Sequence, residues 1–340
     1  MNAVEFDNVS IVFGDHPAVA LPLMDAGQSR EEIQTATGQV LGVHNCSLDV
    51  DSGEILVLMG LSGSGKSTLL RSVNGLNPVA RGEVRVRNGG KMTSVTHTDK
   101  STLRKLRLSL IAMVFQQFGL LPWRTVAENV GLGLELGGMP KVKRDAKVAE
   151  QLELVGLSDW TDRKVGELSG GMQQRVGLAR AFATDAPILL MDEPFSALDP
   201  LIRGRLQDEL LDLQKELKRT IIFVSHDLDE AFKLGNRIAI MEGGRIVQCG
   251  TPRDIFSNPA NEYVADFVAH MNPLGVLCAR DVMETSSVQP IETVGPNETI
   301  HNVMERVHAT GNPVGVVENG NLLGQITKDT VLAKLLDPRS

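Results

Sequence analysis

Cysteine is scarce in this sequence, and basic residues are fewer than acidic ones. The three cysteines, Cys46, Cys249 and Cys278, are odd in number and far apart, so they predict neither a disulfide framework nor a metal-ligand spacing. A reducing compartment is therefore expected. The chain holds 34 Lys and Arg against 42 Asp and Glu, and this net charge of −8 argues against nucleic acid as a partner.

Long apolar runs are missing as well. No run approaches the ~20 residues that a membrane-spanning helix needs, and Met1–Phe13 lacks the basic start and apolar core of a signal peptide. We therefore expect a soluble chain, which leaves docking on a membrane protein open. The hydrophobic fraction of 42% in 340 residues is typical of a globular protein with a sizeable core, in one large domain or two.

Four short aliphatic runs each lead into a polar residue. Continuous apolar runs of this length predict strands that are buried on both faces, hence a mainly parallel sheet. Ligands of such sheets bind beyond the carboxyl ends of the strands, so the four polar ends are expected to converge on one site. The runs are Ile55–Met59 before Gly60, Ile111–Phe115 before Gln116, Ile188–Met191 before Asp192, and Ile221–Val224 before Ser225 and His226.

Helical patterns separate these strands, and a hairpin follows them. The predicted helices are Ser67–Asn74, Lys141–Leu157, Gln173–Phe182 and Leu201–Lys218. Arg237–Met241 and Arg245–Gln248 flank Glu242-Gly243-Gly244 and predict the hairpin.

A second unit is predicted from about Pro273. From Gln289 its order is strand, helix, strand, strand, helix, and Asn319-Gly320 between two apolar runs is a strong hairpin signal. The elements after the first strand are a helix over about Glu298–His308, strands Val314–Val317 and Leu322–Ile326, and a helix over Thr330–Leu336.

The segment between the first buried strand and the first helix fits the phosphate-loop pattern in full. Its glycines let backbone N–H groups point inward around phosphate oxygens, and the helix N-terminus adds favourable partial charge. Lys66 is expected to reach the β- and γ-phosphates of a nucleotide, and Ser67 to ligate Mg²⁺. The pattern consists of Gly60, Leu61, Ser62, Gly63, Ser64, Gly65, Lys66 and Ser67, followed by Thr68.

Polar residues at the other strand ends suit the hydrolysis of that nucleotide. Asp192 suits a Mg²⁺ contact, direct or through water, and Glu193 suits the general base that takes a proton from the attacking water. Gln116 is expected to reach Mg²⁺ or that water, and His226 to contact the γ-phosphate. Taken alone, Gln116 could be an ordinary loop glutamine and His226 a structural histidine. Together with the other polar strand ends, both residues favour a role in the site.

A second anion site is predicted at Ser169-Gly170-Gly171, where a hydroxyl and backbone N–H groups open the following helix. One chain then carries two phosphate-binding helix ends, whereas a nucleotide has one γ-phosphate. The economical solution is a head-to-tail homodimer, in which each nucleotide lies between Gly60–Ser67 of one copy and Ser169–Gly171 of the other.

These motifs, in this order, resemble those of ATP-binding cassette (ABC) transporter ATPases over residues 1–270. The resemblance implies an α/β P-loop NTPase fold with a RecA-like parallel core, an antiparallel β subdomain and a helical subdomain at about 117–165. It implies that Phe13 stacks on adenine, that Asp199 helps the dimer interface communicate, and that Gln116 couples the site to membrane subunits. The remaining matches are the signature Leu168, Ser169, Gly170, Gly171 and Met172, where Met172 replaces a frequent glutamine, and the D-loop Ser196, Ala197, Leu198 and Asp199.

A single cassette without a membrane span resembles the ATPase of an importer. The resemblance implies separate transmembrane permease subunits, indirectly a substrate-binding protein, and a peripheral location on the cytoplasmic face of the inner (plasma) membrane. The 47 positions from Phe13 to Gly60 exceed the usual spacing, and the extra segment, Pro17–Gly42, is similar to that of importers for glycine betaine, proline betaine and choline. The chain looks most like their choline branch. Alternatives are an importer for another cargo, such as methionine, and a soluble ABC ATPase outside transport.

The tail resembles a single cystathionine-β-synthase (CBS) repeat, so a regulatory α+β domain is expected at 289–340 after a linker at 271–288. Such repeats usually come in pairs and often bind adenosine ligands. Here Thr327 is followed by Asp329 and then Thr330, out of register with the usual pattern. Ligand binding, dimerisation and a different small α+β domain remain open.

Overall fold

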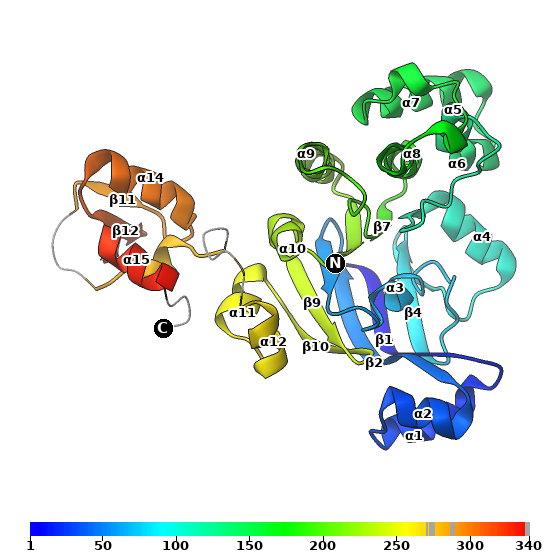
Figure 1. The fold of residues 1–340 in the computed structure, drawn as a ribbon, viewed down its shortest axis with the longest axis horizontal. Helices are drawn as coiled ribbons and strands as arrows, with labels where there is room; N and C mark the ends of the chain where they lie inside the picture. Colours follow the sequence, from blue (N-terminus) through cyan, green and yellow to red (C-terminus); the bar gives the residue numbers. More distant parts are fainter. Residues whose placement is uncertain (270, 272–275, 286–289, 337–340) are drawn as a thin grey trace. The chain divides into compact units, whose positions relative to one another are not determined.

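The computed structural model describes residues 1–269, 271, 276–285 and 290–336. The chain divides into two compact units (Figure 1). The first comprises Met1–His226 with Ala239–Val247, and the second comprises Asp227–Ile238 with Gln248–Ser340. The division into 1–270, 271–288 and 289–340 stays a prediction, because residues 270, 272–275 and 286–289 around its boundaries lie outside the described residues.

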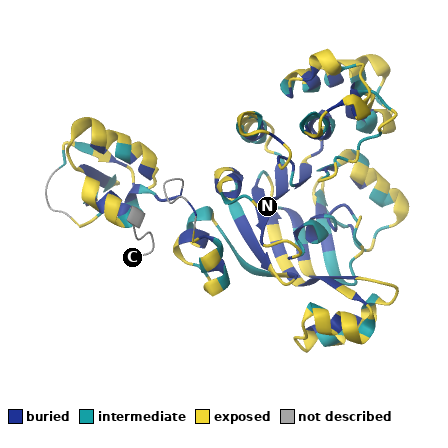
Figure 2. Cartoon of the chain, in the orientation of Figure 1, coloured by how far each residue is buried: buried dark blue, intermediate teal, exposed yellow. Residues whose placement is uncertain are grey.

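The central sheet has six strands in the order β10-β9-β3-β8-β7-β6. The strand pairs β3–β8, β7–β8 and β6–β7 are all parallel, which confirms the predicted parallel core. Every residue of β3, β7 and β8 is buried, as the continuous apolar runs predict (Figure 2). The strands are β3 (Ile55–Met59), β6 (Ile111–Val114), β7 (Ile188–Asp192), β8 (Thr220–Val224), β9 (Arg237–Glu242) and β10 (Arg245–Gly250).

Two strand ends differ from the predicted ones. β6 ends at Val114, so Phe115 lies between the strand and Gln116. β7 runs one residue further than predicted, because Asp192 still pairs with Val224 of the neighbouring strand. Asp192 is therefore part of the sheet, and only Glu193 leaves it.

A four-stranded antiparallel sheet, in the order β2-β1-β4-β5, forms the expected antiparallel subdomain. The alternating burial of β2 shows that one face of this sheet packs on the core and the other faces solvent. The strands are β1 (Asn2–Phe13), β2 (Val40–Asp51), β4 (Arg81–Asn88) and β5 (Lys91–Ser94).

The extra segment between β1 and β2 folds into three short helices, η1 (Pro17–Ala20), α1 (Leu21–Asp25) and α2 (Arg30–Thr37) (Figure 1). A capping box starts α2: the Ser29 side chain accepts from the Glu32 N–H, and the Glu32 side chain accepts from the Ser29 N–H. Gly38 then ends α2 in the left-handed conformation, with φ 70°.

A group of helices lies away from the central sheet (Figure 1), and it spans residues 126–167, against the predicted 117–165 region. It contains α5 (Val126–Val130), α6 (Leu132–Leu136), α7 (Lys141–Leu154), η2 (Ser158–Trp160) and η3 (Val165–Glu167). The predicted helix Lys141–Leu157 is three residues too long. Gly156 turns left-handed, with φ 65°, and the Leu157 N–H bonds back to the Leu152 carbonyl, which closes the helix earlier.

The remaining helices of the first unit follow the strands. α3 (Lys66–Leu70) is shorter than the predicted Ser67–Asn74, because the chain after it continues in three-residue turns up to Gly75, with φ 68°. α8 (Gly170–Ala183) contains the predicted Gln173–Phe182, whereas α9 (Pro200–Leu217) begins and ends one residue before the predicted Leu201–Lys218. α4 (Lys100–Ser109) was not predicted and is capped by Asp99.

The second unit contains a three-stranded sheet, β11-β12-β13, in which β11–β12 is parallel and β12–β13 is antiparallel. The predicted Asn319-Gly320 hairpin is confirmed: both residues have positive φ, 51° and 82°, as a tight two-residue turn requires. The strands are β11 (Glu292–Val294), β12 (Val314–Glu318) and β13 (Asn321–Ile326), and the helices are α10 (Leu228–Leu234), α11 (Pro252–Ser257), α12 (Glu262–Phe267), α13 (Ala279–Val282), α14 (Ile300–Thr310) and α15 (Lys328–Leu336).

Thr327 and Thr330 have a structural explanation within this unit. The Thr330 N–H donates to the Thr327 hydroxyl at 3.2 Å, and the Thr327 N–H donates to the Thr330 hydroxyl at 3.0 Å. The pair therefore caps α15, which accounts for both residues without a ligand. The likeness of this unit to a CBS repeat stays a prediction.

Over the described residues, every helix of the chain is too short or too polar to cross a bilayer.

Candidate nucleotide site

The phosphate-type loop joins the buried strand β3 to α3, and its backbone is one that glycine adopts without strain. Gly60 and Gly65 have φ values of 138° and 101°. A Cβ at Gly60 would lie 2.1 Å from the Met241 carbonyl oxygen, and one at Gly65 would lie 2.7 Å from the Gly42 carbonyl oxygen. Two of the predicted glycines are thus required by close backbone approach as well as by conformation.

Lys66 begins α3 and is folded back onto its own loop. Its side chain is 7% exposed, and its Nζ donates to the carbonyls of Gly60 at 2.8 Å and Leu61 at 2.9 Å. Burial lowers the pKa of Lys66, and the nearby Glu193 and Asp192 carboxylates oppose that shift. Neutral carbonyls are weak partners for a buried cation, so an anion in the loop is a better partner.

Asp192 is fully buried at the end of β7 and lies against the loop. Its Oδ1 accepts from the Ser67 hydroxyl at 2.6 Å, and its Oδ2 accepts from Arg71 Nη2 at 2.8 Å. The sheet thus brings two predicted ligands together from positions 125 residues apart. Arg71, one turn beyond the loop, was missed by the sequence analysis, because an arginine on a helix has no distinguishing signal.

Glu193 leaves the strand in a strained conformation. Its φ of 49° is left-handed, which costs a non-glycine residue about 1–3 kcal/mol and is found mostly at functional sites. The turn aims the carboxylate at two other predicted residues: Gln116 Nε2 donates to Oε2 at 3.1 Å, and His226 Nδ1 lies 3.6 Å from the same oxygen.

These side chains line a cavity of about 660 Å³. Phe13 stands at the same cavity, where its ring is 39% exposed and free to stack. Gly60, Leu61 and Ser64, although part of the motif, are not among the residues that line the cavity. The lining residues are Phe13, Arg30, Val40, Leu41, Gly42, Ser62, Gly63, Gly65, Lys66, Ser67, Thr68, Gln116, Glu193 and His226.

The second predicted anion site opens α8. The Ser169 hydroxyl accepts from the Met172 N–H at 3.3 Å, and both Ser169 and Gly170 are exposed. Leu168 is buried beneath them. Among the described residues that line the Phe13 cavity, none belongs to Leu168–Met172. Within one chain, then, the signature is exposed and separate from the loop it was expected to complete.

Gln174, on the buried face of α8, links that helix to Glu193. Its Nε2 donates to the Glu193 carbonyl at 3.2 Å, and its Oε1 accepts from the Ala197 N–H at 2.9 Å. The Ser196 hydroxyl donates to the same Glu193 carbonyl at 3.0 Å. The sequence did not predict this role, because the burial of Gln174 depends on how α8 packs in the fold.

The predicted D-loop lies between Glu193 and α9. Leu198 is buried, and the Asp199 side chain caps α9 by accepting from the Ile202 N–H at 3.0 Å. Gly171 of the signature packs against this loop, since a Cβ there would lie 3.1 Å from the Ala197 carbonyl oxygen. The D-loop and the signature are therefore in contact within one chain.

Known proteins with the same arrangement identify the family. A family model described as "ABC transporter" matches residues 43–196. The glycine betaine/proline betaine transport system ATP-binding protein ProV of Salmonella typhimurium is 44% identical over 336 residues, which cover 98% of this chain and 82% of that protein. The chain belongs to the osmoprotectant family of ABC transporter ATP-binding subunits. It is an ATPase with an ABC cassette, as the motifs predicted.

A second relative of this ABC subunit matches it nearly end to end. The trimethylamine N-oxide transport system ATP-binding protein TmoW of Ruegeria pomeroyi is 42% identical over 97% of this chain and 96% of its own length. Among solved structures, a dimeric ABC cassette in a post-hydrolysis state with ADP and Pi matches with a TM-score of 0.64 and 31% identity, covering 74% of this chain and 99% of that one. The predicted cassette fold is confirmed.

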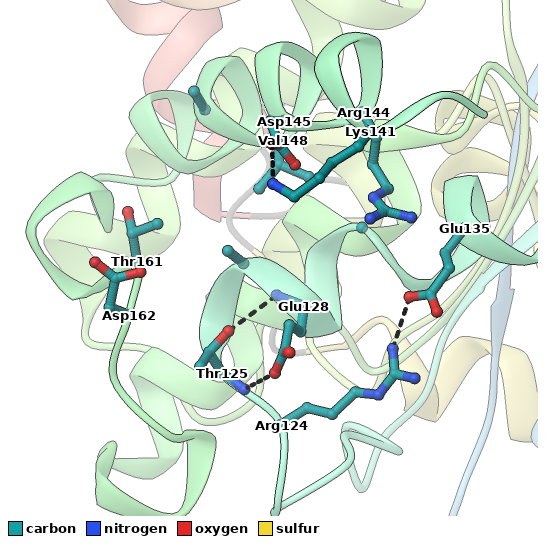
Figure 3. Close-up of a pocket in the computed structure, with 13 residues that line it drawn as sticks. Arg124, Thr125, Glu128, Glu135, Lys141, Arg144, Asp145, Val148, Thr161 and Asp162 are labelled. Atoms are coloured by element: carbon teal, nitrogen blue, oxygen red, sulfur yellow. Dashed lines mark hydrogen bonds and ion pairs between the residues drawn. The ribbon is translucent and has the colours of Figure 1, made fainter.

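The helical region of this ABC subunit contains a second hollow, of about 620 Å³ (Figure 3). Arg124 donates to Glu135 at 2.8 Å across it, and Lys141 pairs with Asp145 at 2.5 Å on α7. The Thr125 and Glu128 capping box starts α5 at its edge. Its lining carries both signs of charge, which suits a polar protein segment better than an apolar ligand.

Proposed function

We propose that this chain powers an importer for a quaternary amine osmoprotectant, such as choline or glycine betaine, through ATP-driven closure of a homodimer. Lys66, Ser67 and Glu193 line one cavity, and the buried Asp192 holds the Ser67 hydroxyl from behind it; this arrangement carries the proposal for the ATPase half. Lys66 takes the β- and γ-phosphates, Phe13 stacks on adenine, and the N–H groups of Gly60–Thr68 surround the phosphate oxygens.

Mg²⁺ fits the residues present. Ser67 Oγ and Asp192 Oδ1 are hard oxygen donors 2.6 Å apart, and the cation usually needs only one or two protein ligands beside the phosphates. Among the described residues, no group of three or more His, Cys, Asp or Glu side chains is placed to hold a metal ion, and the proposed site draws its remaining ligands from the phosphates. Bound there with Gln116 nearby, the cation supplies charge neutralisation at the phosphates.

Glu193 is proposed as the general base. Gln116 Nε2 and His226 Nδ1 both contact the same Glu193 oxygen, Oε2. These two side chains therefore orient the carboxylate toward the γ-phosphate side of the cavity. A water held between Glu193 and the terminal phosphate gives up its proton to the carboxylate as it attacks. His226, 65% exposed in its side chain, is placed to hold the γ-phosphate.

A second copy is proposed to complete each site. The signature helix α8 is 14 residues long, and its N-terminus is exposed with Ser169 and Gly170. The free N–H groups at such a helix start are suited to bind an anion. It stands apart from the cavity of its own chain, so its phosphate belongs to a partner. Closure of the dimer buries both nucleotides, and hydrolysis reopens it.

Permease subunits are the partners to which the closure of the dimer is proposed to be transmitted. The hollow around Arg124, Glu135 and Lys141 carries charges of both signs and lies in the helical region that follows Gln116 in the sequence. A polar segment of a transmembrane partner seated there would place this chain on the cytoplasmic face of the membrane, as a peripheral subunit. A substrate-binding protein is then an indirect partner.

The cargo is proposed from the relatives. Glycine betaine and proline betaine, in the name of one, share a fully alkylated cationic nitrogen. Trimethylamine N-oxide is a second candidate, because that relative matches this chain over 96% of its own length rather than 82%. Neither name favours methionine or a role outside transport, and the choline branch stays a prediction.

The test is uptake by the reconstituted system. The chain, its permease and its substrate-binding protein are placed in vesicles, and ATP-dependent uptake of labelled glycine betaine, choline, trimethylamine N-oxide and methionine is compared. Uptake of a methylated amine, lost with Glu193→Gln, is expected. Uptake of methionine alone, or none that depends on ATP, would contradict the proposal.

A further inference from the structure

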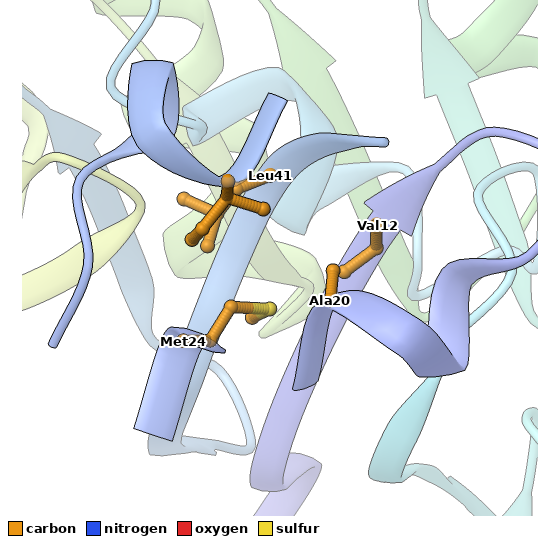
Figure 4. Packing of buried hydrophobic residues seen from close by; sticks show 5 residues of the cluster. Val12, Ala20, Met24 and Leu41 are labelled. Carbon is orange, nitrogen blue, oxygen red and sulfur yellow. The ribbon is translucent and has the colours of Figure 1, made fainter. Parts of the chain in front are cut away.

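The inserted segment between β1 and β2 is a folded part of the first unit with its own small core. Ala20, Met24 and Ile33 are buried against Val12 of β1 and Leu41 of β2 (Figure 4). Ala20 and Ile33 have no exposed surface. The segment therefore has a defined position on the sheet, and its helices hold their side chains in place.

Charged contacts fix the segment further. Asp25, at the end of α1, accepts two hydrogen bonds from Arg81, at 2.7 and 2.8 Å, and lies 3.2 Å from His44 Nε2. A bidentate arginine pair fixes orientation as well as distance. With the capping box at Ser29, these contacts determine where α2 begins, and Arg30 is its first residue.

Arg30 reaches from this helix into the nucleotide site. Its Nη1 donates to the Gly63 carbonyl, in the middle of the phosphate loop, at 2.7 Å. Its Nη2 donates to the Gly42 carbonyl of β2 at 3.4 Å. Arg30 thus bridges the two segments that form one wall of the cavity, and it lines that cavity beside Phe13 and Thr68.

One of the two bridged positions, Gly42, lies where the wall is closely packed. The Gly42 carbonyl lies close to Gly65 of the loop, and a Cβ at Gly42 would lie 2.9 Å from the Phe13 ring. A shift of β2 relative to the phosphate loop would therefore move the Phe13 ring, the proposed adenine platform, relative to the phosphates. The guanidinium is planar and rigid, so it holds this spacing better than a flexible ammonium would.

Arg30 also has donors to spare. Two of its five N–H groups are used on carbonyls, and its buried Nε has no acceptor among the described residues. A guanidinium satisfied only by neutral carbonyls at the edge of an anion site gains from a phosphate or ribose oxygen nearby.

We propose that Arg30 makes the inserted segment a working part of the ATP site. It sets the spacing between the phosphate loop and the adenine platform and adds a cation at the ribose–phosphate part of the nucleotide. ATP binding and the ordering of Ser29–Thr37 are consequently coupled. This inference rests on the proposed assignment of the cavity to ATP.

Binding of a fluorescent ATP analogue to the full chain tests the inference. Arg30→Gln is expected to weaken binding, and to raise the KM for ATP, by about tenfold, the loss expected for a charge-assisted hydrogen bond. The kcat is expected to change less than about twofold, because Glu193 is not contacted. Arg30→Lys restores part of the affinity, since one donor can still reach Gly63. Lys105→Gln, an exposed lysine on α4, is the charge-matched control.

Hydrogen exchange supplies a second readout. In the wild type, the amides of 30–37 are expected to exchange more slowly when ATP is added, and this protection is expected to vanish in Arg30→Gln. Unchanged ATP affinity in a folded Arg30→Gln chain overturns the inference, as does the absence of nucleotide-linked protection in the wild type. If the wild type binds no ATP while its fold is intact, the assignment of the cavity itself fails.

Discussion

Asp192 and Glu193 are adjacent in sequence, yet one backbone rotation gives them different environments. Asp192 ends a buried strand and holds Ser67 and Arg71, whereas Glu193 turns left-handed and faces the cavity. A carboxylate locked by two donors suits a structural or metal-binding role, and one that faces an open cavity suits proton transfer. The division of labour between the two acids follows from where the sheet ends.

Glu193→Gln tests the assignment of the base. The amide keeps the size of the side chain and removes the proton acceptor, so ATP binding is expected to persist while hydrolysis slows by at least ~10²-fold. The closed dimer should then accumulate with ATP, as size-exclusion chromatography will report. Glu150→Gln, on the exposed face of α7, is the control. Hydrolysis at the wild-type rate would remove Glu193 from the mechanism.

At the scale of the element, α8 carries two groups of contacts, one at its exposed start and one on its buried face. Its exposed start carries Ser169, and its buried face carries Gln174, which holds the Glu193 carbonyl and the Ala197 N–H. In the proposed dimer, a phosphate of the partner's nucleotide bound at that helix end would be linked to Glu193 and the D-loop through Gln174. The sequence predicted the helix and its start, whereas this linkage depends on which face of it is buried.

Ser169→Arg and Gly170→Asp test the exposed end of α8. Both residues are far from Lys66 in sequence and absent from the cavity lining, so ATP affinity is expected to stay within about twofold of the wild type. Loss of a preorganised anion site is expected to slow hydrolysis by about 10²-fold and to prevent dimer formation. Ser158→Arg, an exposed serine of the same region, is the control. Full ATPase activity in either variant would contradict a shared site.

The inserted element carries a pH-dependent contact. Burial lowers the pKa of His44 from its usual 6.5, and the hydrogen bond to Asp25 opposes that shift only in part. The unfolded chain therefore binds more protons than the folded one near pH 6, so the free energy of unfolding decreases as pH falls below 6.5. Asp25 contributes in a separate window, because Arg81 lowers its pKa to about 2 and its contribution is lost only as pH falls from 3.8 toward that value.

Denaturant unfolding between pH 7.5 and pH 5.5 measures the histidine's contribution. His44→Gln is expected to flatten the pH dependence over this range, whatever its effect on stability at pH 7.5. His97→Gln, at an exposed position, is the comparison that should keep the wild-type slope. Equal slopes in the wild type and His44→Gln would show that His44 does not titrate differently on folding.

At the scale of the whole molecule, the proposed ATP site needs the phosphate loop of one chain and the signature of another. ATPase activity per chain is therefore expected to fall as the protein is diluted below the concentration at which it dimerises. Activity and oligomeric state, measured together by a dilution series and analytical ultracentrifugation, check this. A constant rate per chain in samples that sediment as monomers would refute the dimer.

The order of motifs along the chain was enough to predict the cassette fold and the ATPase activity without a structure. The loop Gly60–Ser67, the acidic pair and the signature are local patterns whose chemistry depends on residue type and spacing, so the cassette fold and the ATPase activity were predictable. The strands were predictable for a similar reason, because a continuous apolar run is buried on both faces wherever it lies. Helix ends were not, since α3 and α7 stop at turns that tertiary packing selects.

Only the tertiary structure decided which distant residues meet. Arg30 lies 33 positions from Gly63, and Arg71 lies 121 positions from Asp192, and no local pattern pairs either arginine with its partner. The left-handed turn of Glu193 likewise exists because the sheet ends one residue before it. Side-chain chemistry is written in the sequence, but the contacts of a long, rotatable arginine depend on how the sheet, the loop and the inserted helix pack together.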